Sequence, residues 1–195
     1  MTQGTSTEGY AALLRGINVG GKKKVPMAGL RPVIEGLGLT DVRTYLQSGN
    51  VAFTVPSGGD ASEDSLAAAI TKAIEAEFGF TVDVLVRGHA YLKAVMADCP
   101  FPAAELEAKQ LHVTYFSEPV TAERFAAVDP AEYAPEDFRL GDRALYLYAP
   151  QGLGVSKLGA QLSRPGLNKG LIATSRNWNT VTKLVELTAP HRARP

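Results

Sequence analysis

Apolar residues between positions 10 and 97 follow strand and helix periods in an order that few folds can accommodate. Short apolar runs bounded by turn residues predict strands, and apolar residues that recur on one helical face predict helices. The resulting order is strand, helix, strand, strand, helix, strand, which is that of the split βαβ, or ferredoxin-like, unit. The expected strands cover 10–15, 42–46, 51–55 and 81–86, and the expected helices cover 26–37, 62–78 and 91–97.

Boundary signals are strongest for the helix expected at 62–78. Ser62 can cap its first turn, and Gly79 can end it in a left-handed conformation. Between them an apolar residue recurs at every fourth position, at Leu66, Ile70, Ile74 and Phe78. The run Gln47-Ser48-Gly49-Asn50 lies between two expected strands and predicts a hairpin turn.

The second half of the chain predicts a similar order of elements, which suggests a structural repeat. Strands are expected at 111–116, 138–140 and 144–148, and helices at 121–128, 156–162 and 177–187. The run Cys99-Pro100-Phe101-Pro102 interrupts the pattern and marks a domain boundary. We therefore expect an α+β protein of two ferredoxin-like halves, with antiparallel or mixed sheets and helices packed on one face. The expected parts are disordered tails at 1–9 and 191–195, an N-terminal ferredoxin-like domain at 10–99 and a C-terminal α+β domain at 103–190.

The composition favours a globular protein outside the secretory and membrane classes. Apolar residues make up 45% of the chain, and no apolar stretch is long enough to span a bilayer. One cysteine cannot form an internal disulfide, and the N-terminal residues lack the basic and apolar regions of a secretory signal. We expect a cytoplasmic protein with no membrane partner; the sequence leaves its oligomeric state open.

Basic and acidic side chains, 20 of each, cancel in number but are sorted along the chain. Residues 9–34 carry five cations and no acid, and residues 143–185 carry six cations and no acid. The span 60–142 carries sixteen acids against six bases. Clustered charge of one sign attracts a charged partner, so the two acid-free stretches predict a basic site. The alternative is that these cations are scattered over loops and helix faces.

The glycine-rich run at 16–23, GINVGGKK, follows an expected strand and invites comparison with a phosphate loop. A nucleotide-hydrolysing P-loop needs Ser or Thr after its lysine to bind magnesium, and this chain has Lys23 there. Pro26 also places the helix start several residues beyond the lysines. The motif argues against nucleotide hydrolysis and leaves two interpretations, a looser anion site or a permissive turn with solvated lysines.

The expected topology brings this loop next to the hairpin turn. The first two strands of a split βαβ unit are parallel, so the segments that follow them emerge at the same edge of the sheet. Donor-rich side chains around a glycine-rich turn suit phosphate or carboxylate oxygens. For the turn itself, ordinary hairpin chemistry is the alternative. The residues gathered there are Arg15, Asn18, Lys22, Gln47, Ser48 and Asn50.

Two later segments place a cation where a helix is expected to begin. Ser156 can cap a helix with Lys157 in its first turn, and Thr174 or Ser175 can cap one that includes Arg176. Such a cation opposes the helix dipole unless an anion lies nearby; alternatively, each cation pairs with an acid elsewhere. The candidate ligand-binding residues are Arg15, Gly16, Asn18, Gly20, Gly21, Lys22, Gln47, Ser48, Asn50, Ser156, Lys157, Arg176, Asn177 and Asn179.

Other residue types indicate no metal or cofactor site. The three histidines lack metal-ligand spacing, and Cys99 has no second thiolate with which to bind zinc. We therefore expect no metal and no cofactor, and the sequence assigns no catalytic residue. Tyr146 and Tyr148 share one face of their strand, where they either stack on bases or cover a second layer.

Several runs are distinctive when taken together: 13–22, 25–27, 42–50, 156–158 and 176–180. They resemble the bacterial family catalogued as domain of unknown function 1697, and the likeness extends from about Tyr10 to Leu187. The resemblance implies an α+β fold and a cytoplasmic location. It brings no established activity, substrate or catalytic residue.

The leading hypothesis is a module that binds a phosphate-bearing or other anionic ligand, a nucleotide or nucleic acid, in a basic inter-domain cleft. The second is an enzyme acting on a small anionic metabolite, with Arg15, Asn50 and Arg176 as clamps. The third is a protein-interaction scaffold. Sequence-specific RNA reading is disfavoured, because 51–55 offers one aromatic residue where an RNA recognition motif needs several.

Overall fold

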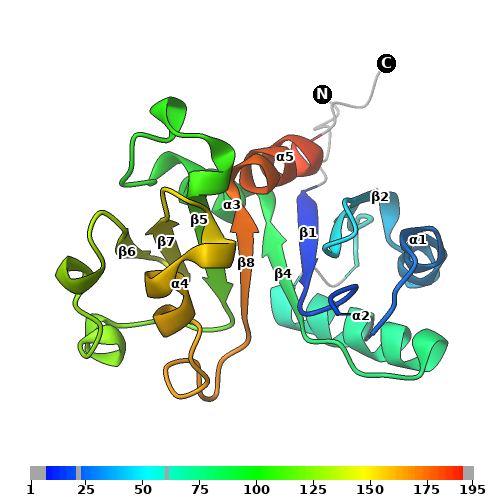
Figure 1. Cartoon of the computed structure of the whole chain (residues 1–195). Coiled ribbons are helices and arrows are strands. Elements are labelled where there is room, and N and C mark those ends of the chain that lie inside the picture. Colours follow the sequence, from blue (N-terminus) through cyan, green and yellow to red (C-terminus); the bar gives the residue numbers. More distant parts are fainter. Residues whose placement is uncertain (1–7, 21–22, 60–61, 191–195) are drawn as a thin grey trace, which may run out of the picture. The chain divides into compact units, whose positions relative to one another are not determined.

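Strands and helices follow one another in the first part of the chain in the expected split βαβ order (Figure 1). The computed structural model describes residues 8–20, 23–59 and 62–190, so Gly21, Lys22 and most of both expected tails lie outside the described residues. The elements are β1 (Gly9–Leu14), α1 (Met27–Glu35), β2 (Thr40–Tyr45), β3 (Asn50–Thr54), α2 (Glu63–Phe78), β4 (Val84–Gly88) and α3 (His89–Ala97).

The first sheet has the strand order β2-β3-β1-β4, with every neighbouring pair antiparallel. Because β1 and β2 are both antiparallel to β3, they run parallel to each other. Their C-terminal ends therefore lie at the same edge of the sheet, where β4 begins. This edge holds the described parts of the loop after β1, at 15–20 and 23–26, together with the turn at 46–49 and the link between α2 and β4.

The ends of α2 lie where the sequence predicts them. The Ser62 side chain accepts a hydrogen bond from the Ser65 amide, and Gly79 ends the helix at φ 77°. A left-handed residue after the last turn satisfies helical carbonyls and suits glycine, which has no Cβ to clash. Helix α1 begins after Pro26 and ends before Gly36, so it is slightly shorter than the expected range 26–37.

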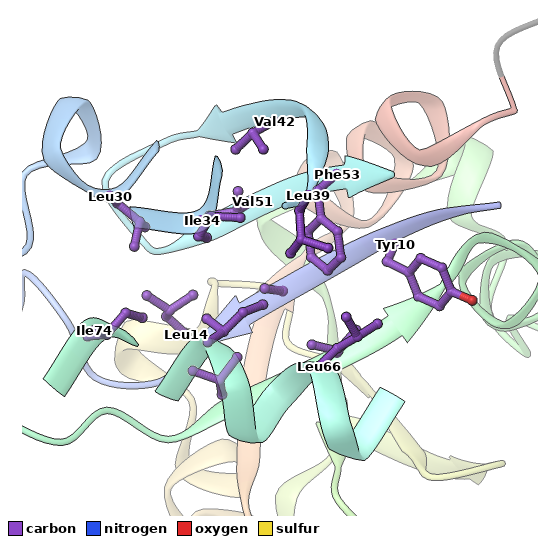
Figure 2. Packing of buried hydrophobic residues seen from close by; sticks show 14 of the residues in the cluster. Tyr10, Leu14, Leu30, Ile34, Leu39, Val42, Val51, Phe53, Leu66 and Ile74 are labelled. Carbon is purple, nitrogen blue, oxygen red and sulfur yellow. The ribbon is translucent and has the colours of Figure 1, made fainter. Parts of the chain in front are cut away.

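Helices α1 and α2 cover one face of this sheet, and the core lies between them and the strands (Figure 2). Leu30 and Ile34 of α1 and Ile74 of α2 are fully buried there. Burial of each such side chain contributes roughly 1.5–3 kcal/mol relative to exposure. This packing fixes the strand ends from which the loops project.

The second sheet has the order β6-β7-β5-β8, again with every neighbouring pair antiparallel. The chain therefore forms two sheets of the same ferredoxin-like strand order. The elements are β5 (Leu111–Phe116), β6 (Asp137–Gly141), β7 (Ala144–Tyr148), α4 (Lys157–Leu162), β8 (Ala173–Asn177) and α5 (Trp178–Thr188). Short 3-10 turns lie at Ala103–Glu105, Ala108–Gln110, Ala122–Phe125, Pro130–Tyr133 and Leu153–Val155.

Two expectations for the second half are wrong. The helix expected at 121–128 is a single 3-10 turn, Ala122–Phe125, because the segment buries only Phe125 and leads to Asp129-Pro130, where an α-helix is disfavoured. Residues 174–177 are not the start of a helix but strand β8. Burial alternates along them, with Thr174 and Arg176 on one face, which is a strand period.

Matching arginines mark the repeat between the two sheets. Arg87 is the penultimate residue of β4, and Arg176 is the penultimate residue of β8. Each donates from Nη1 to the carbonyl of its preceding residue, at 2.7 Å for Arg87 and 2.8 Å for Arg176. Each strand then leads directly into a helix, α3 or α5.

The described residues form two compact units. One contains those up to Leu92 and from Leu184 onward, and the other is Lys93–Lys183. The boundary between the units falls inside α3 and α5. Among residues 8–20, 23–59 and 62–190, no helix combines the length and hydropathy that crossing a bilayer requires.

Candidate functional site

Asn18 holds the loop after β1 against the turn after β2, as the topology predicts. Its side-chain amide donates to the Gln47 carbonyl at 2.9 Å and to the Val25 carbonyl at 3.0 Å. Its Oδ1 accepts from the Val25 amide at 2.9 Å. Asn18 therefore closes its own loop and joins that loop to the neighbouring turn. Its side chain does this by hydrogen bonds to backbone groups.

The turn is fixed from inside by Asn50 and Gly49. Asn50 is fully buried, and its amide donates to the Tyr45 carbonyl and the Ser48 hydroxyl, both at 3.0 Å. The Gly49 carbonyl accepts from the Leu14 amide at 2.8 Å, which joins the turn to β1. Asn50 is a positioning residue for the turn, while Gln47 and Ser48 are exposed.

Three cations of the first acid-free stretch are described at this edge. Arg15 forms a half-exposed ion pair with Asp83 at 3.2 Å, and Lys23 donates to the Thr81 carbonyl at 2.8 Å. Lys24 is exposed and forms no ion pair with any residue the structure describes. Asp83 is the carboxylate that pairs with a cation here, and Glu75 at the end of α2 accepts from the Thr81 hydroxyl at 2.8 Å. Lys23 and Lys24 therefore keep charges that no ion pair among the described residues neutralises.

Two exposed aliphatic side chains flank the contact between loop and turn. Val19 follows Asn18 and is 70% exposed, and Leu46 precedes Gln47 and is 54% exposed. Leu46 also adopts a left-handed backbone conformation at φ 59°, which is disfavoured for residues other than glycine. Asn18 at φ 57° and Lys23 at φ 48° share that conformation, so unusual backbone concentrates at this edge.

In the second unit, Ser156 caps α4 as predicted, but its surroundings include an acid far away in sequence. The Ser156 hydroxyl donates to Glu136 at 2.6 Å and accepts from the Gly159 amide at 2.8 Å. The Glu136 carboxylate also accepts from the Leu158 amide at 2.9 Å and lies 3.3 Å from that of Lys157. The anion expected near Lys157 is thus supplied by the chain itself.

Arg176 is buried in the second sheet and stays charged. Its Nη1 donates to the Thr174 hydroxyl at 2.7 Å, and burial lowers its pKa from 12.5 to about 10. In the register of β5 it lies opposite Val113, and Val113 in turn lies opposite Tyr146 of β7, so these three residues share a face.

The second-unit candidates do not come together around one ligand. Leu158 of α4 packs with Leu147 of β7 on the face opposite Arg176, so Ser156 and Lys157 are separated from Arg176 by the sheet. Asn177 accepts from the amide and hydroxyl of Thr180 at the start of α5, and Asn179 is exposed. That the two acid-free stretches converge on one cleft stays a prediction.

A family model described as "Protein of unknown function (DUF1697)" matches residues 7–146. The chain belongs to this family. The match confirms the resemblance that the sequence motifs indicate. A conserved bacterial protein, SP0830 from Streptococcus pneumoniae, matches the DUF1697 chain at a TM-score of 0.71 and 23% identity, covering 93% of this chain and 99% of that one. That likeness supports the fold; no curated protein matches the chain.

Some residues at this edge of the DUF1697 protein lie outside the sequence motifs, and sequence reasoning missed them. Asp83 and Thr81 lie more than fifty positions from the loop they contact, and no local pattern marks them. Val19 and Leu46 sit inside the motifs but read as ordinary apolar residues. Only the folded structure shows that both are exposed.

The two tyrosines of β7 and the cysteine contribute to packing, and their surroundings do not indicate a binding site. The Tyr146 hydroxyl is buried and donates to the Val95 carbonyl at 2.7 Å, and Tyr148 packs against Phe101. These tyrosines cover a second layer, the alternative to base stacking. Burial raises the pKa of the Cys99 thiol, which disfavours the thiolate that a nucleophile needs.

Proposed function

We propose that this protein binds a phosphate-bearing or other anionic ligand through the β1–α1 loop and the β2–β3 turn. The observation that carries the proposal is the Asn18 amide, which holds the loop against the Gln47 carbonyl. A preorganised pair of loops loses little conformational entropy when a ligand binds. The exposed groups available to the ligand are the cation of Lys24 and the side chains of Gln47 and Ser48.

Charge supports an anion over a cation or a neutral ligand. Arg15 and Asp83 form a half-exposed ion pair, which neutralises only part of the arginine charge, and no ion pair among the described residues neutralises Lys23 or Lys24. Phosphate oxygens accept several charge-assisted hydrogen bonds at once, so they suit such a surface.

The enzyme hypothesis has less support. Of its three clamps, Asn50 is fully buried and bonded within the turn, and Arg176 is buried in the second unit. Arg15 alone remains half-exposed. An enzyme would need an acid–base group near the bound substrate, and the described residues of the loop and the turn include no acid and no histidine. The carboxylates beside them, Asp83 and Glu75, are bonded to Arg15 and Thr81.

Titration of the protein with inorganic polyphosphate tests the proposal, since this polymer offers phosphates and nothing else. Affinity should fall as salt rises, because each neutralised phosphate releases a counterion. Lys24→Ala should weaken binding and reduce the slope of log affinity against log salt by about 0.7. The matched control is Lys72→Ala, an exposed lysine of α2, which should leave both unchanged.

Absence of polyphosphate binding at low salt would exclude the proposed function. Equal losses for Lys24→Ala and Lys72→Ala would show attraction to the whole protein instead of to these loops, and would also contradict it.

A further inference from the structure

Leu46 is doubly unfavourable in the free protein. Its side chain is 54% exposed, so it contributes little packing, and its backbone at φ 59° places it in a region that costs a non-glycine residue roughly 1–2 kcal/mol. Asparagine or glycine would fit this position better. A residue that harms both solvation and backbone energy points to a contact formed only with a partner.

Val19 belongs to the same surface. It is 70% exposed and follows Asn18, whose amide bonds to the residue after Leu46. Val19 and Leu46 are therefore each next in the chain to one of the two residues that this hydrogen bond joins, and Lys24 belongs to the same loop as Val19. The surface combines apolar groups, amide and hydroxyl groups and positive charge.

We propose that the partner of this surface is single-stranded nucleic acid, an inference that rests on the proposed anion-binding function. Phosphates of the strand pair with Lys24 and Arg15, and unstacked bases cover Val19 and Leu46. Gln47 and Ser48 then donate or accept at base edges or phosphates. The exposed apolar, amide, hydroxyl and cationic groups named here each have a counterpart in such a strand.

Other anionic partners leave part of the surface unused. A phosphate ion has no apolar group with which to cover Val19 and Leu46, and a free nucleotide has a single base for the two side chains. A duplex hides its base faces by stacking. A bilayer would accept Val19 and Leu46 but would have to desolvate the Gln47 amide beside them.

The test measures how tightly two variants of the protein bind a single-stranded oligonucleotide and, separately, inorganic polyphosphate. Leu46→Asn keeps a residue that tolerates the left-handed backbone, and Val19→Thr keeps the side-chain shape, so both should fold with undiminished stability. Each should bind the oligonucleotide about five- to tenfold more weakly and polyphosphate as well as the unmodified protein does. Val155→Thr, at an exposed valine of the second unit, is the matched control and should change neither.

The outcomes separate the inference from the proposed function. If Leu46→Asn and Val19→Thr bind the oligonucleotide normally while polyphosphate still depends on Lys24, the inference is wrong and anion binding stands. Tighter binding of duplex, or of vesicles of acidic phospholipid, than of the single strand also overturns the inference. If neither polymer binds, the proposed function fails and the inference fails with it.

Discussion

Single residues determine whether the loop and the turn can lie together. Gly49 shows this most clearly, because it occupies a left-handed conformation at φ 77° and leaves no room for a side chain. A Cβ there would lie 2.7 Å from the Leu14 Cβ and 2.8 Å from the Ile17 Cδ1. Both contacts are too short for carbon atoms, so the turn would have to move away from β1.

Gly49→Ala is therefore expected to destabilise the protein by roughly 1–3 kcal/mol, through the clash and the unfavourable φ together. Gly16→Ala is the matched control, since Gly16 has φ 67° but open space where its Cβ would lie. It should cost only about 1 kcal/mol, from the backbone alone. Urea unfolding followed by far-ultraviolet circular dichroism, to which the strands and helices of both units contribute, measures the two variants; equal losses would refute the packing argument.

Element boundaries are best predicted where one local signal is sufficient. Ser62 and Gly79 define α2 because a cap and a left-handed stop act within one helical turn. Strand β8 is missed because Thr174, Ser175 and Asn177 resemble helix caps, while the pairing with β5 that makes them a strand comes from sixty positions away. The contacts of Asp83 and Glu136 are not predicted for the same reason, because their partners are also distant in sequence.

Helix α4 gives a prediction at this scale. Glu136→Gln should keep the shape of the side chain but remove the charge that accepts from Ser156 and Leu158, at a cost of about 1–2 kcal/mol. Glu132→Gln, on the exposed 3-10 turn at Pro130–Tyr133, should be neutral. Urea unfolding of the two variants measures the difference, and similar stabilities would show that the carboxylate contributes nothing to α4.

For the whole molecule, charge along the sequence overstates the charge that is free at the surface. Arg176 counts among the cations of the second acid-free stretch but is only 6% exposed. Its counterpart in the repeat, Arg87, is 2% exposed and pairs with Glu63 at 3.2 Å. The repeat thus places one buried arginine in each sheet. Surface charge therefore has to be read from the folded units: Lys24 is exposed in the first acid-free stretch, and Lys157, Arg164 and Lys169 are exposed in the second.

Stability of the whole protein should fall between neutral and mildly acidic pH because of His112 in β5. Burial lowers its pKa below 6.5, and its Nδ1 has no hydrogen-bond partner among the described residues. Below pH 6.5 the unfolded chain takes up a proton that the folded chain resists, so stability is complete above that pH and declines as pH falls toward the folded pKa. His112→Gln should flatten this decline in urea midpoints measured from about pH 7.5 to 5.5, a window above the titration of ordinary carboxyl groups. An unchanged slope in the variant would mean that His112 is protonated in the folded protein as readily as in the unfolded chain.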